Sequence, residues 1–314
     1  MPVLPHRRLG TSALDVSLFS LGSWRTFERI PRDHGLAVMR TARDVGINFL
    51  DDARYNDESG LAPIPTGYSE IIFGELFRGA GWVRDEVVVA NKLWWEFWPE
   101  QDAVAEIDGS LGRMGLDHID LIYTMQPPDG LGVAELVEQV AGLIASGRAR
   151  AWGIGNWPAD ALAVAVQAAR DLGAPLPAAA QLPYSLVNPD WVESPAMEAV
   201  LADADIGLVA SYVLAGGTLT GKYLQGETGR ANLDDTPAIV AGKQRAAAVV
   251  AFAREWNVTP ASVAFSFALA HPRLASVLFG ATSPQQIVEN VASLDVFTSL
   301  DDDQLRRLRE LATI

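Results

Sequence analysis

Two charged residues, Lys92 and Asp51, stand at the ends of short apolar segments of this 314-residue chain. Lys92 follows the run Glu86–Asn91, and Asp51 closes the run Ile47–Asp51. Both runs are typical of buried strands, and the strand ends at one rim of a parallel barrel are where barrel enzymes hold their reacting groups. Because a buried ammonium–carboxylate pair is costly to desolvate, this pattern predicts a functional pair at a barrel rim. An ion pair without a chemical role is the alternative.

Short β-branched runs alternate with longer amphipathic segments along the whole chain. Strands are predicted at 18–22, 47–51, 86–91, 119–124, 149–154, 178–181, 207–211 and 276–279. Helices are predicted near 33–45, 69–79, 100–114, 132–146, 158–172, 192–204, 241–255 and 301–312, with an extra helix from 260 to 269. Eight such alternations without a break in composition predict an α/β fold, a (β/α)₈ TIM barrel that forms a single domain over residues 1–314.

Segments outside this alternation have predicted roles of their own. Residues 7–10 and 14–17 flank a Gly-Thr-Ser turn and predict an N-terminal β-hairpin, which could plug the bottom of the barrel. The stretches 55–68 and 223–237 are too long for simple connections, so we expect extended loops at the C-terminal rim.

Composition narrows the class of protein. The formal net charge of −15 argues against nucleic acid as a main partner. The chain has no cysteine, which excludes disulfides, thiolate metal sites and cysteine nucleophiles. No apolar stretch approaches the ~20 residues of a membrane helix, and the first residues lack the apolar core of a signal peptide. We therefore expect a cytoplasmic protein without membrane insertion.

Nine segments in the same order resemble the aldo-keto reductases, closest to the branch that contains the β-subunits of voltage-gated potassium channels. The segments are 8–17, 21–24, 48–53, 84–92, 119–123, 153–156, 181–185, 214–223 and 280–290. The resemblance implies an NADPH-dependent oxidoreductase that reduces an aldehyde or ketone by hydride transfer. It also implies a catalytic tetrad of Asp, Tyr, Lys and His.

Asp51 and Lys92 fall on two tetrad positions, and we expect the ammonium to lower the pKa of a neighbouring tyrosine. The family pattern puts that tyrosine five residues after the aspartate, where this chain has Asn56; Tyr55 comes one residue early. Tyr55 is the favoured acid and Tyr68 the second candidate. Met125 occupies the histidine position, and a thioether cannot donate a hydrogen bond, so slower turnover or a narrower range of substrates is expected.

The resemblance also implies a site for NADP. Asn156 and Gln181 match the pair that binds the nicotinamide carboxamide. Ser211 stands where the family has its stacking aromatic residue, and Tyr212 follows one position late. A change of one position moves a strand residue to the other face. The remaining cofactor positions are Gly22, Ser23, Trp24, Asp51, Leu214, Gly216, Thr220, Gly221, Lys222, Arg230, Gly280, Thr282, Gln286, Glu289 and Asn290.

Aromatic residues follow Lys92 directly. Trp94 and Trp95, together with Trp24 and Met125, are predicted to form an apolar wall for the carbonyl substrate. The alternative is a hydrophobic cluster that only packs the loop against a helix.

Two other functions stay open at this stage. One is a regulatory or redox-sensing protein that binds NADP(H) with weak or no turnover, which the potassium-channel resemblance and Met125 both permit. The other is a barrel hydrolase or lyase that uses Asp51 and Glu96 as paired carboxylates. The sequence predicts neither the physiological substrate nor the oligomeric state, although a homo-oligomer is possible.

Overall fold

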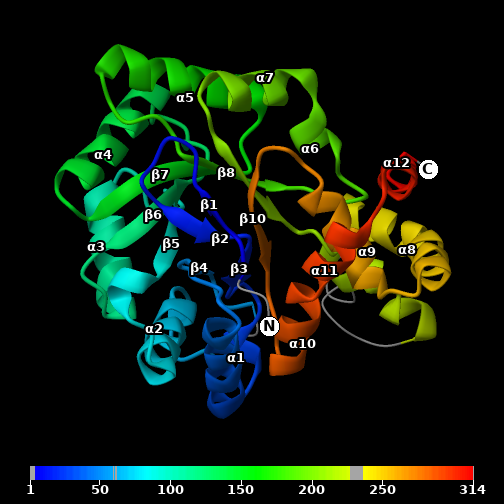
Figure 1. Cartoon of the computed structure of the whole chain (residues 1–314). Helices are drawn as coiled ribbons and strands as arrows, with labels where there is room; N and C mark the ends of the chain where they lie inside the picture. Colours follow the sequence, from blue (N-terminus) through cyan, green and yellow to red (C-terminus); the bar gives the residue numbers. More distant parts are fainter. Residues whose placement is uncertain (1–3, 59, 61, 227–235, 314) are drawn as a thin grey trace.

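Parallel strands close into a ring at the centre of the molecule (Figure 1). The computed structural model describes residues 4–58, 60, 62–226 and 236–313. Within these residues the closed barrel has eight strands in the order β10-β3-β4-β5-β6-β7-β8-β9. Their bounds are β3 Phe19–Gly22, β4 Phe49–Asp51, β5 Val88–Leu93, β6 Ile119–Thr124, β7 Ala149–Gly155, β8 Ala179–Pro183, β9 Gly207–Ser211 and β10 Leu274–Phe279. The predicted TIM barrel is confirmed.

Helices surround this ring and cover its outer surface (Figure 1). Most follow the strands in alternation: α1 Arg32–Asp44, α2 Tyr68–Ala80, α3 Ala103–Met114, α4 Val133–Ala145, α5 Ala159–Leu172, α6 Asp190–Glu193, α7 Pro195–Asp203, α8 Pro237–Trp256 and α9 Pro260–Leu269. After β10 come α10 Pro284–Val291, α11 Ser293–Ser299 and α12 Asp302–Leu311. Short 3-10 turns are η1 Phe27–Arg29, η2 Arg84–Glu86, η3 Ala215–Thr220 and η4 Lys222–Gln225. No helix of the described residues is long and apolar enough to cross a membrane.

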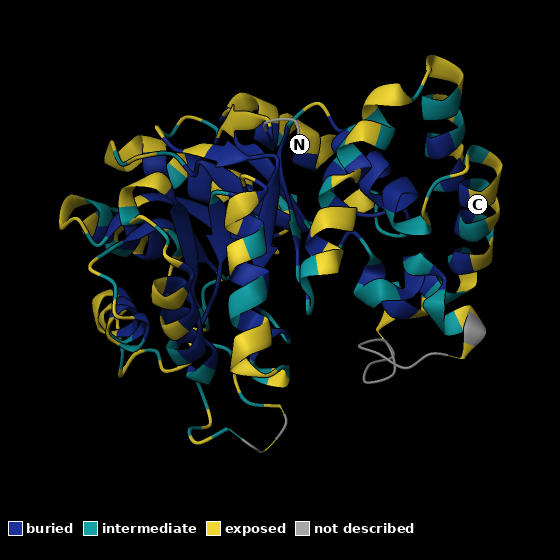
Figure 2. Ribbon diagram, turned by 60° about the horizontal axis from the view of Figure 1, so that its bottom comes forward, coloured by how far each residue is buried: buried dark blue, intermediate teal, exposed yellow. Residues whose placement is uncertain are grey.

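Burial explains why the strands read as nearly continuous apolar runs. Every residue of β3, β4, β5 and β6 is buried, because side chains point alternately into the barrel and toward the helices. The helices instead show buried and exposed faces, with the exposed residues outward (Figure 2). Buried residues repeat differently along strands and along helices, so the sequence alone indicates where strands alternate with helices.

The N-terminal hairpin closes one end of the barrel, as predicted. Strands β1 His6–Arg8 and β2 Asp15–Ser17 pair antiparallel. Leu9, Leu14 and Val16 are buried in one cluster with interior barrel residues such as Phe49 and Val209. The hairpin therefore fills the N-terminal end with apolar side chains and leaves the opposite end, where the strands finish, for the loops.

One predicted helix is not continuous in the structure. The segment 192–204 is divided between α6 and α7 at Ser194, whose backbone is extended (φ −63°, ψ 139°). The next residue, Pro195, begins α7. A proline disfavours helical geometry in the residue before it, so the chain interrupts the helix here.

Candidate active site

Four side chains meet where strands β4, β5 and β8 end. The Lys92 ammonium donates to Asp51 Oδ1 at 2.5 Å and to the Tyr55 hydroxyl oxygen at 3.1 Å. Gln181 Nε2 donates to the other carboxylate oxygen of Asp51 at 2.9 Å. The Lys92 side chain is 6% exposed and that of Asp51 is 3% exposed. This is therefore a desolvated pair whose charges are each bonded to a neighbour, the condition under which a buried ion pair persists.

The paired strands of the barrel bring these groups to the same rim. Asp51 pairs with Ala90 between β4 and β5, Lys92 pairs with Tyr123 on β6, and Gly155 pairs with Gln181 between β7 and β8. Each strand is hydrogen-bonded to a neighbour on both sides, so the backbone under the site is fixed. The predicted meeting of an ammonium and a carboxylate at the C-terminal rim is what the structure contains.

Tyr55 reaches this cluster through a tight turn. Its N–H donates to the carbonyl of Ala53 at 2.8 Å, two residues back. With this turn, Tyr55 contacts Lys92 although it comes one residue earlier in the sequence than the family pattern places its tyrosine. Tyr68, the second candidate, lies at the start of α2, where its hydroxyl accepts a hydrogen bond from Arg32 Nη2 at 3.0 Å. The structure thus joins Tyr55, and not Tyr68, to the ammonium.

The net shift of the Tyr55 pKa is upward, so the ammonium of Lys92 does not set its direction in this structure. Burial raises the pKa of the phenol well above its usual value, and the negative charges of Asp51 and Asp52 raise it further. The neutral phenol is therefore the stable form at ordinary pH, with its O–H available as a donor.

Met125 packs against the backbone of the next strand. A Cβ added to Gly155 would lie 2.8 Å from the Met125 sulfur, so the glycine makes room for the thioether. The Met125 N–H donates to the carbonyl of Leu93 at 3.0 Å. This position at the rim holds a soft apolar group and no hydrogen-bond donor.

The tryptophans predicted to form one wall are divided between two environments. Trp94 makes an edge contact with Tyr55, with the ring centroids 6.0 Å apart, and Trp24 lies 6.5 Å from the Tyr212 ring. Trp95 is 2% exposed and donates its indole N–H to Thr124 Oγ1 at 2.9 Å. Although Trp95 is predicted to line the substrate site, its side chain is packed in the core of this structure, and its backbone is left-handed (φ 61°).

A cavity of about 500 Å³ opens beside Tyr55. Trp24 and Trp94 line it together with residues of the 55–68 loop. Its volume suits a small organic molecule. The long loop predicted from the sequence thus contributes to a pocket next to the Tyr55–Lys92–Asp51 cluster.

The residues expected at the nicotinamide lie around this cluster. Asn156 follows β7 in a left-handed conformation (φ 58°), and its N–H donates to the carbonyl of Gln181 at 3.0 Å. Tyr212 also has a left-handed backbone (φ 59°) directly after Ser211, the last residue of β9. That backbone turn, which the alternation of a regular strand does not allow, brings the Tyr212 ring toward Trp24 across the rim.

A glycine-rich turn follows Leu214. Gly216, Gly217 and Gly221 have φ of 67°, 87° and 80°, which residues with a side chain rarely adopt. A Cβ on Gly217 would lie 3.5 Å from the Lys222 Nζ, and the Thr220 hydroxyl donates to the Gly217 carbonyl at 2.8 Å. A compact backbone beside an ammonium fits a pyrophosphate. Arg230 lies outside the described residues.

The second expected phosphate site is the start of α10, after Gly280. Ser283 caps this helix, and Gln286 Oε1 accepts hydrogen bonds from the Thr282 N–H at 2.8 Å and the Thr282 hydroxyl at 3.3 Å. Glu289 accepts from Gln285 Nε2 at 2.8 Å, and Asn290 is buried. Because β9 and β10 are neighbours in the barrel, this helix start and the glycine-rich turn lie on adjacent parts of the rim. In this structure Thr282 and Gln286, two of the expected adenosine contacts, are bonded to each other.

Comparison with known proteins agrees with this geometry. A profile of the Aldo/keto reductase family matches residues 19–313. The chain belongs to that family. It is 30% identical to a probable voltage-gated potassium channel subunit beta of Oryza sativa subsp. japonica, over 97% of this chain and 95% of that protein. A putative subunit of the same kind from Schizosaccharomyces pombe is 27% identical, over 98% and 93%. The L-glyceraldehyde 3-phosphate reductase of Escherichia coli (strain K12) is 29% identical, over 94% and 89%.

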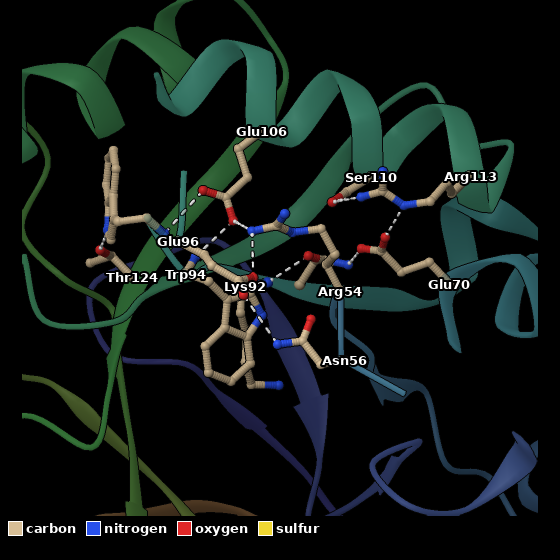
Figure 3. Close-up of polar contacts among 12 residues, drawn as sticks. Arg54, Asn56, Glu70, Lys92, Trp94, Glu96, Glu106, Ser110, Arg113 and Thr124 are labelled. Atoms are coloured by element: carbon tan, nitrogen blue, oxygen red, sulfur yellow. Dashed lines mark hydrogen bonds and ion pairs between the residues drawn. The ribbon is translucent and has the colours of Figure 1, made fainter. Parts of the chain in front are cut away.

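This member of the Aldo/keto reductase family has a buried network at its rim that the sequence did not predict. Glu106 of α3 accepts hydrogen bonds from the backbone N–H groups of Trp94 (2.9 Å) and Trp95 (3.1 Å), and from Arg54 Nη2 at 3.1 Å (Figure 3). Arg54 also lies 3.5 Å from Glu96. Glu106 thus holds the loops after β4 and β5 together. Glu96 bonds Asn56 and Arg54, whereas Asp51 bonds Lys92 and Gln181, so the two carboxylates have no common partner among these contacts.

A second missed group lies beside Asp51. Asp52 is fully buried; its Oδ1 accepts the hydroxyl of Ser23, while its Oδ2 has no hydrogen-bond partner in the described structure. Burial, followed by the charge of Glu70, raises the pKa of Asp52 well above its usual value. Ser23, predicted to contact the cofactor, therefore has its hydroxyl engaged by Asp52. The sequence feature that could have indicated this group is the pair of adjacent aspartates, Asp51 and Asp52.

Proposed function

We propose that this protein is an NADPH-dependent reductase of aldehydes or ketones, in which Tyr55, Lys92 and Asp51 manage the proton. The observation that supports this most strongly is the contact of the Lys92 ammonium with both the Tyr55 hydroxyl and the Asp51 carboxylate. The ~500 Å³ cavity beside Tyr55 provides the place for a carbonyl compound.

Each side chain has a distinct task in this proposal. Asp51 and Gln181 fix the ammonium, which occupies a lone pair of the Tyr55 oxygen and leaves the phenolic O–H for the substrate. The O–H donates to the carbonyl oxygen and then transfers its proton to the developing alkoxide. Lys92 stabilises the phenolate that this transfer creates. NADPH, when bound, supplies the hydride that the carbonyl carbon receives.

The proposed cofactor contacts divide by chemistry. Asn156, Gln181 and Tyr212 would face the nicotinamide, with Gly22 and Trp24 at the adjacent strand end. Lys222 with the backbone of Leu214–Gly221 would hold the pyrophosphate, and Thr282, Gln286 and Asn290 would hold the adenosine end. Calorimetric titration of NADPH into Lys222→Met and Thr282→Val variants checks both assignments.

The decisive variant is Tyr55→Phe, with Tyr68→Phe as its matched control. Loss of the phenolic proton is expected to lower kcat by about 10²- to 10⁴-fold, measured as NADPH consumption with a panel of aldehydes, while NADPH affinity is unchanged. Tyr68→Phe is expected to keep wild-type turnover because its hydroxyl bonds Arg32. Equal turnover by wild type and Tyr55→Phe would refute the assignment.

A second candidate is a protein that binds NADP(H) and turns over poorly. It is supported by Met125, which offers no hydrogen-bond donor where the family resemblance implies histidine, and by relatives named as potassium channel subunits. Tight NADPH binding without consumption of any aldehyde would favour this candidate. Met125→His is then expected to raise turnover, which a single-turnover measurement would detect.

A further inference from the structure

The wall of the ~500 Å³ cavity carries more negative than positive groups among the described residues. Its carboxylates belong to Glu28, Asp57, Glu58 and Glu96. Its guanidinium groups belong to Arg25, Arg29 and Arg54. With a formal net charge of −15 on the whole chain, the field at this mouth opposes anions.

Two of the arginines are bound by one carboxylate. Glu58 Oε2 accepts from Arg25 Nε at 2.6 Å and lies 3.3 Å from Arg29 Nη2. Arg29 Nε also lies 3.3 Å from Glu28. The Arg25 guanidinium stacks over Trp24, 4.6 Å from the ring centroid. Glu58 therefore offsets part of the positive charge that either guanidinium would present to an anionic substrate.

The third arginine is engaged more deeply. The Arg54 side chain is 4% exposed and is bonded to Glu106 at 3.1 Å, with Glu96 at 3.5 Å. Its guanidinium also lies 4.7 Å from the centroid of the Phe97 ring. Two carboxylates and an aromatic face therefore compensate this charge before any ligand arrives.

The rest of the wall near Tyr55 is aromatic. Trp24 and Trp94 line the cavity with Tyr55 itself, and Trp94 contacts the Tyr55 ring edge to face. Flat indole surfaces favour an apolar or aromatic body on the substrate.

We propose that the substrate is an uncharged aldehyde or ketone with an apolar body, and that this cavity excludes carboxylated and phosphorylated carbonyl compounds. The proposal rests on the reductase function above and names its substrate class. Glu58 is the specificity-determining residue, because its carboxylate is shared by two guanidinium groups that would otherwise attract an anion more strongly. The protein would then differ in substrate charge from the Escherichia coli relative, which is named for a phosphorylated aldehyde.

The experiment compares methyl 4-formylbenzoate with 4-carboxybenzaldehyde, which have similar shapes and differ by one negative charge. For the wild-type protein, kcat/KM for the ester is expected to exceed that for the acid by about tenfold or more. Glu58→Gln should reduce this ratio by about three- to tenfold, since Arg25 and Arg29 lose their common partner. Comparing ratios between variants cancels the intrinsic reactivity of the two aldehydes.

The matched control is Glu255→Gln, which removes a glutamate from an ion pair with Arg307 outside the cavity. It should leave the ester-to-acid ratio unchanged. A wild-type preference for the acid, or a ratio that Glu58→Gln does not alter, would overturn the inference. Calorimetry with the same two aldehydes and no reductant decides the charge preference by binding alone. In the turnover assay, absence of NADPH consumption with both aldehydes would count against the reductase function. In calorimetry, tighter binding of the acid than of the ester would count against the proposed substrate class.

Discussion

Removing the Glu106 carboxylate should cost far more stability than removing Glu96, although both contact Arg54. Glu106 is 2% exposed and bonds Arg54 and two backbone N–H groups; Glu96 is 40% exposed and lies farther from Arg54, at 3.5 Å. Glu106→Ala leaves a buried guanidinium without its nearest partner, a change that costs about 3–5 kcal/mol. The N–H groups of Trp94 and Trp95 lose their acceptor as well.

The magnitude follows from the partners that are left behind. Burial raises the pKa of Glu106 despite the hydrogen bonds from Trp94, Trp95 and Arg54, so the ionised pair itself adds little net stability. The cost of Glu106→Ala therefore comes from the desolvated groups that it abandons. Glu106→Gln, which keeps acceptor oxygen for a backbone N–H, should cost less, about 1–2 kcal/mol. Glu96→Ala should cost less than about 1 kcal/mol.

Urea unfolding followed by circular dichroism and tryptophan fluorescence gives the free energy of unfolding for each variant. From most to least stable, the predicted order is wild type, Glu96→Ala, Glu106→Gln and Glu106→Ala. A loss of about 4 kcal/mol is a large part of the ~5–15 kcal/mol of a typical domain. The reasoning is refuted if Glu106→Ala and Glu96→Ala agree within about 1 kcal/mol, because exposure of the carboxylate would then be irrelevant.

Three further predictions concern burial elsewhere in the chain. Because the folded state raises the pKa of Asp52, the free energy of unfolding should fall as pH rises above about 4. Asp52→Asn should weaken this pH dependence and raise the free energy of unfolding at neutral pH. Urea titrations at several pH values would show both effects. Burial lowers the pKa of His271, so stability should also fall as pH drops through about 6.5, and His271→Gln should reduce that loss in thermal scans. A Cβ on Gly74 would lie 2.1 Å from the Met114 carbonyl oxygen, whereas a Cβ on Gly112 meets nothing within 4 Å. Gly74→Ala should therefore lower the free energy of unfolding by about 1–3 kcal/mol, and Gly112→Ala should raise it by about 0.5–1 kcal/mol. Similar values for the two variants would contradict the packing argument.

The sequence predicted the barrel and its Asp51–Lys92 pair because both depend on local periodicity. Strand runs that end in a charge, repeated in a parallel ring, must bring those charges to one rim. The choice between Tyr55 and Tyr68 could not be made from spacing, because it depends on the tight turn at Ala53. In the structure the turn at Ala53 accompanies the contact of Tyr55 with the ammonium, while Tyr68 is bonded to Arg32.

Other features were hidden because they depend on tertiary contacts or on φ. Glu106 lies inside an amphipathic helix, where a glutamate ordinarily reads as solvent-exposed, yet its side chain is buried under two loops. Tyr212 and Trp95 have positive φ, and this sign reverses the direction that strand or loop alternation would give the side chain. Positive φ is common for glycine and enriched for asparagine, aspartate and histidine, so the local sequence does not predict it for a tyrosine or a tryptophan.

The ring of strands has a consequence for how this protein could diverge. Asp51, Lys92 and Gln181 are carried by backbone that is paired on both sides, whereas Glu58 and its neighbours stand on a connection outside the ring. Tyr55 stands on that same connection, three residues before Glu58. Substitutions or insertions beyond Tyr55 can therefore change which substrates bind while Asp51, Lys92 and Gln181 keep their spacing.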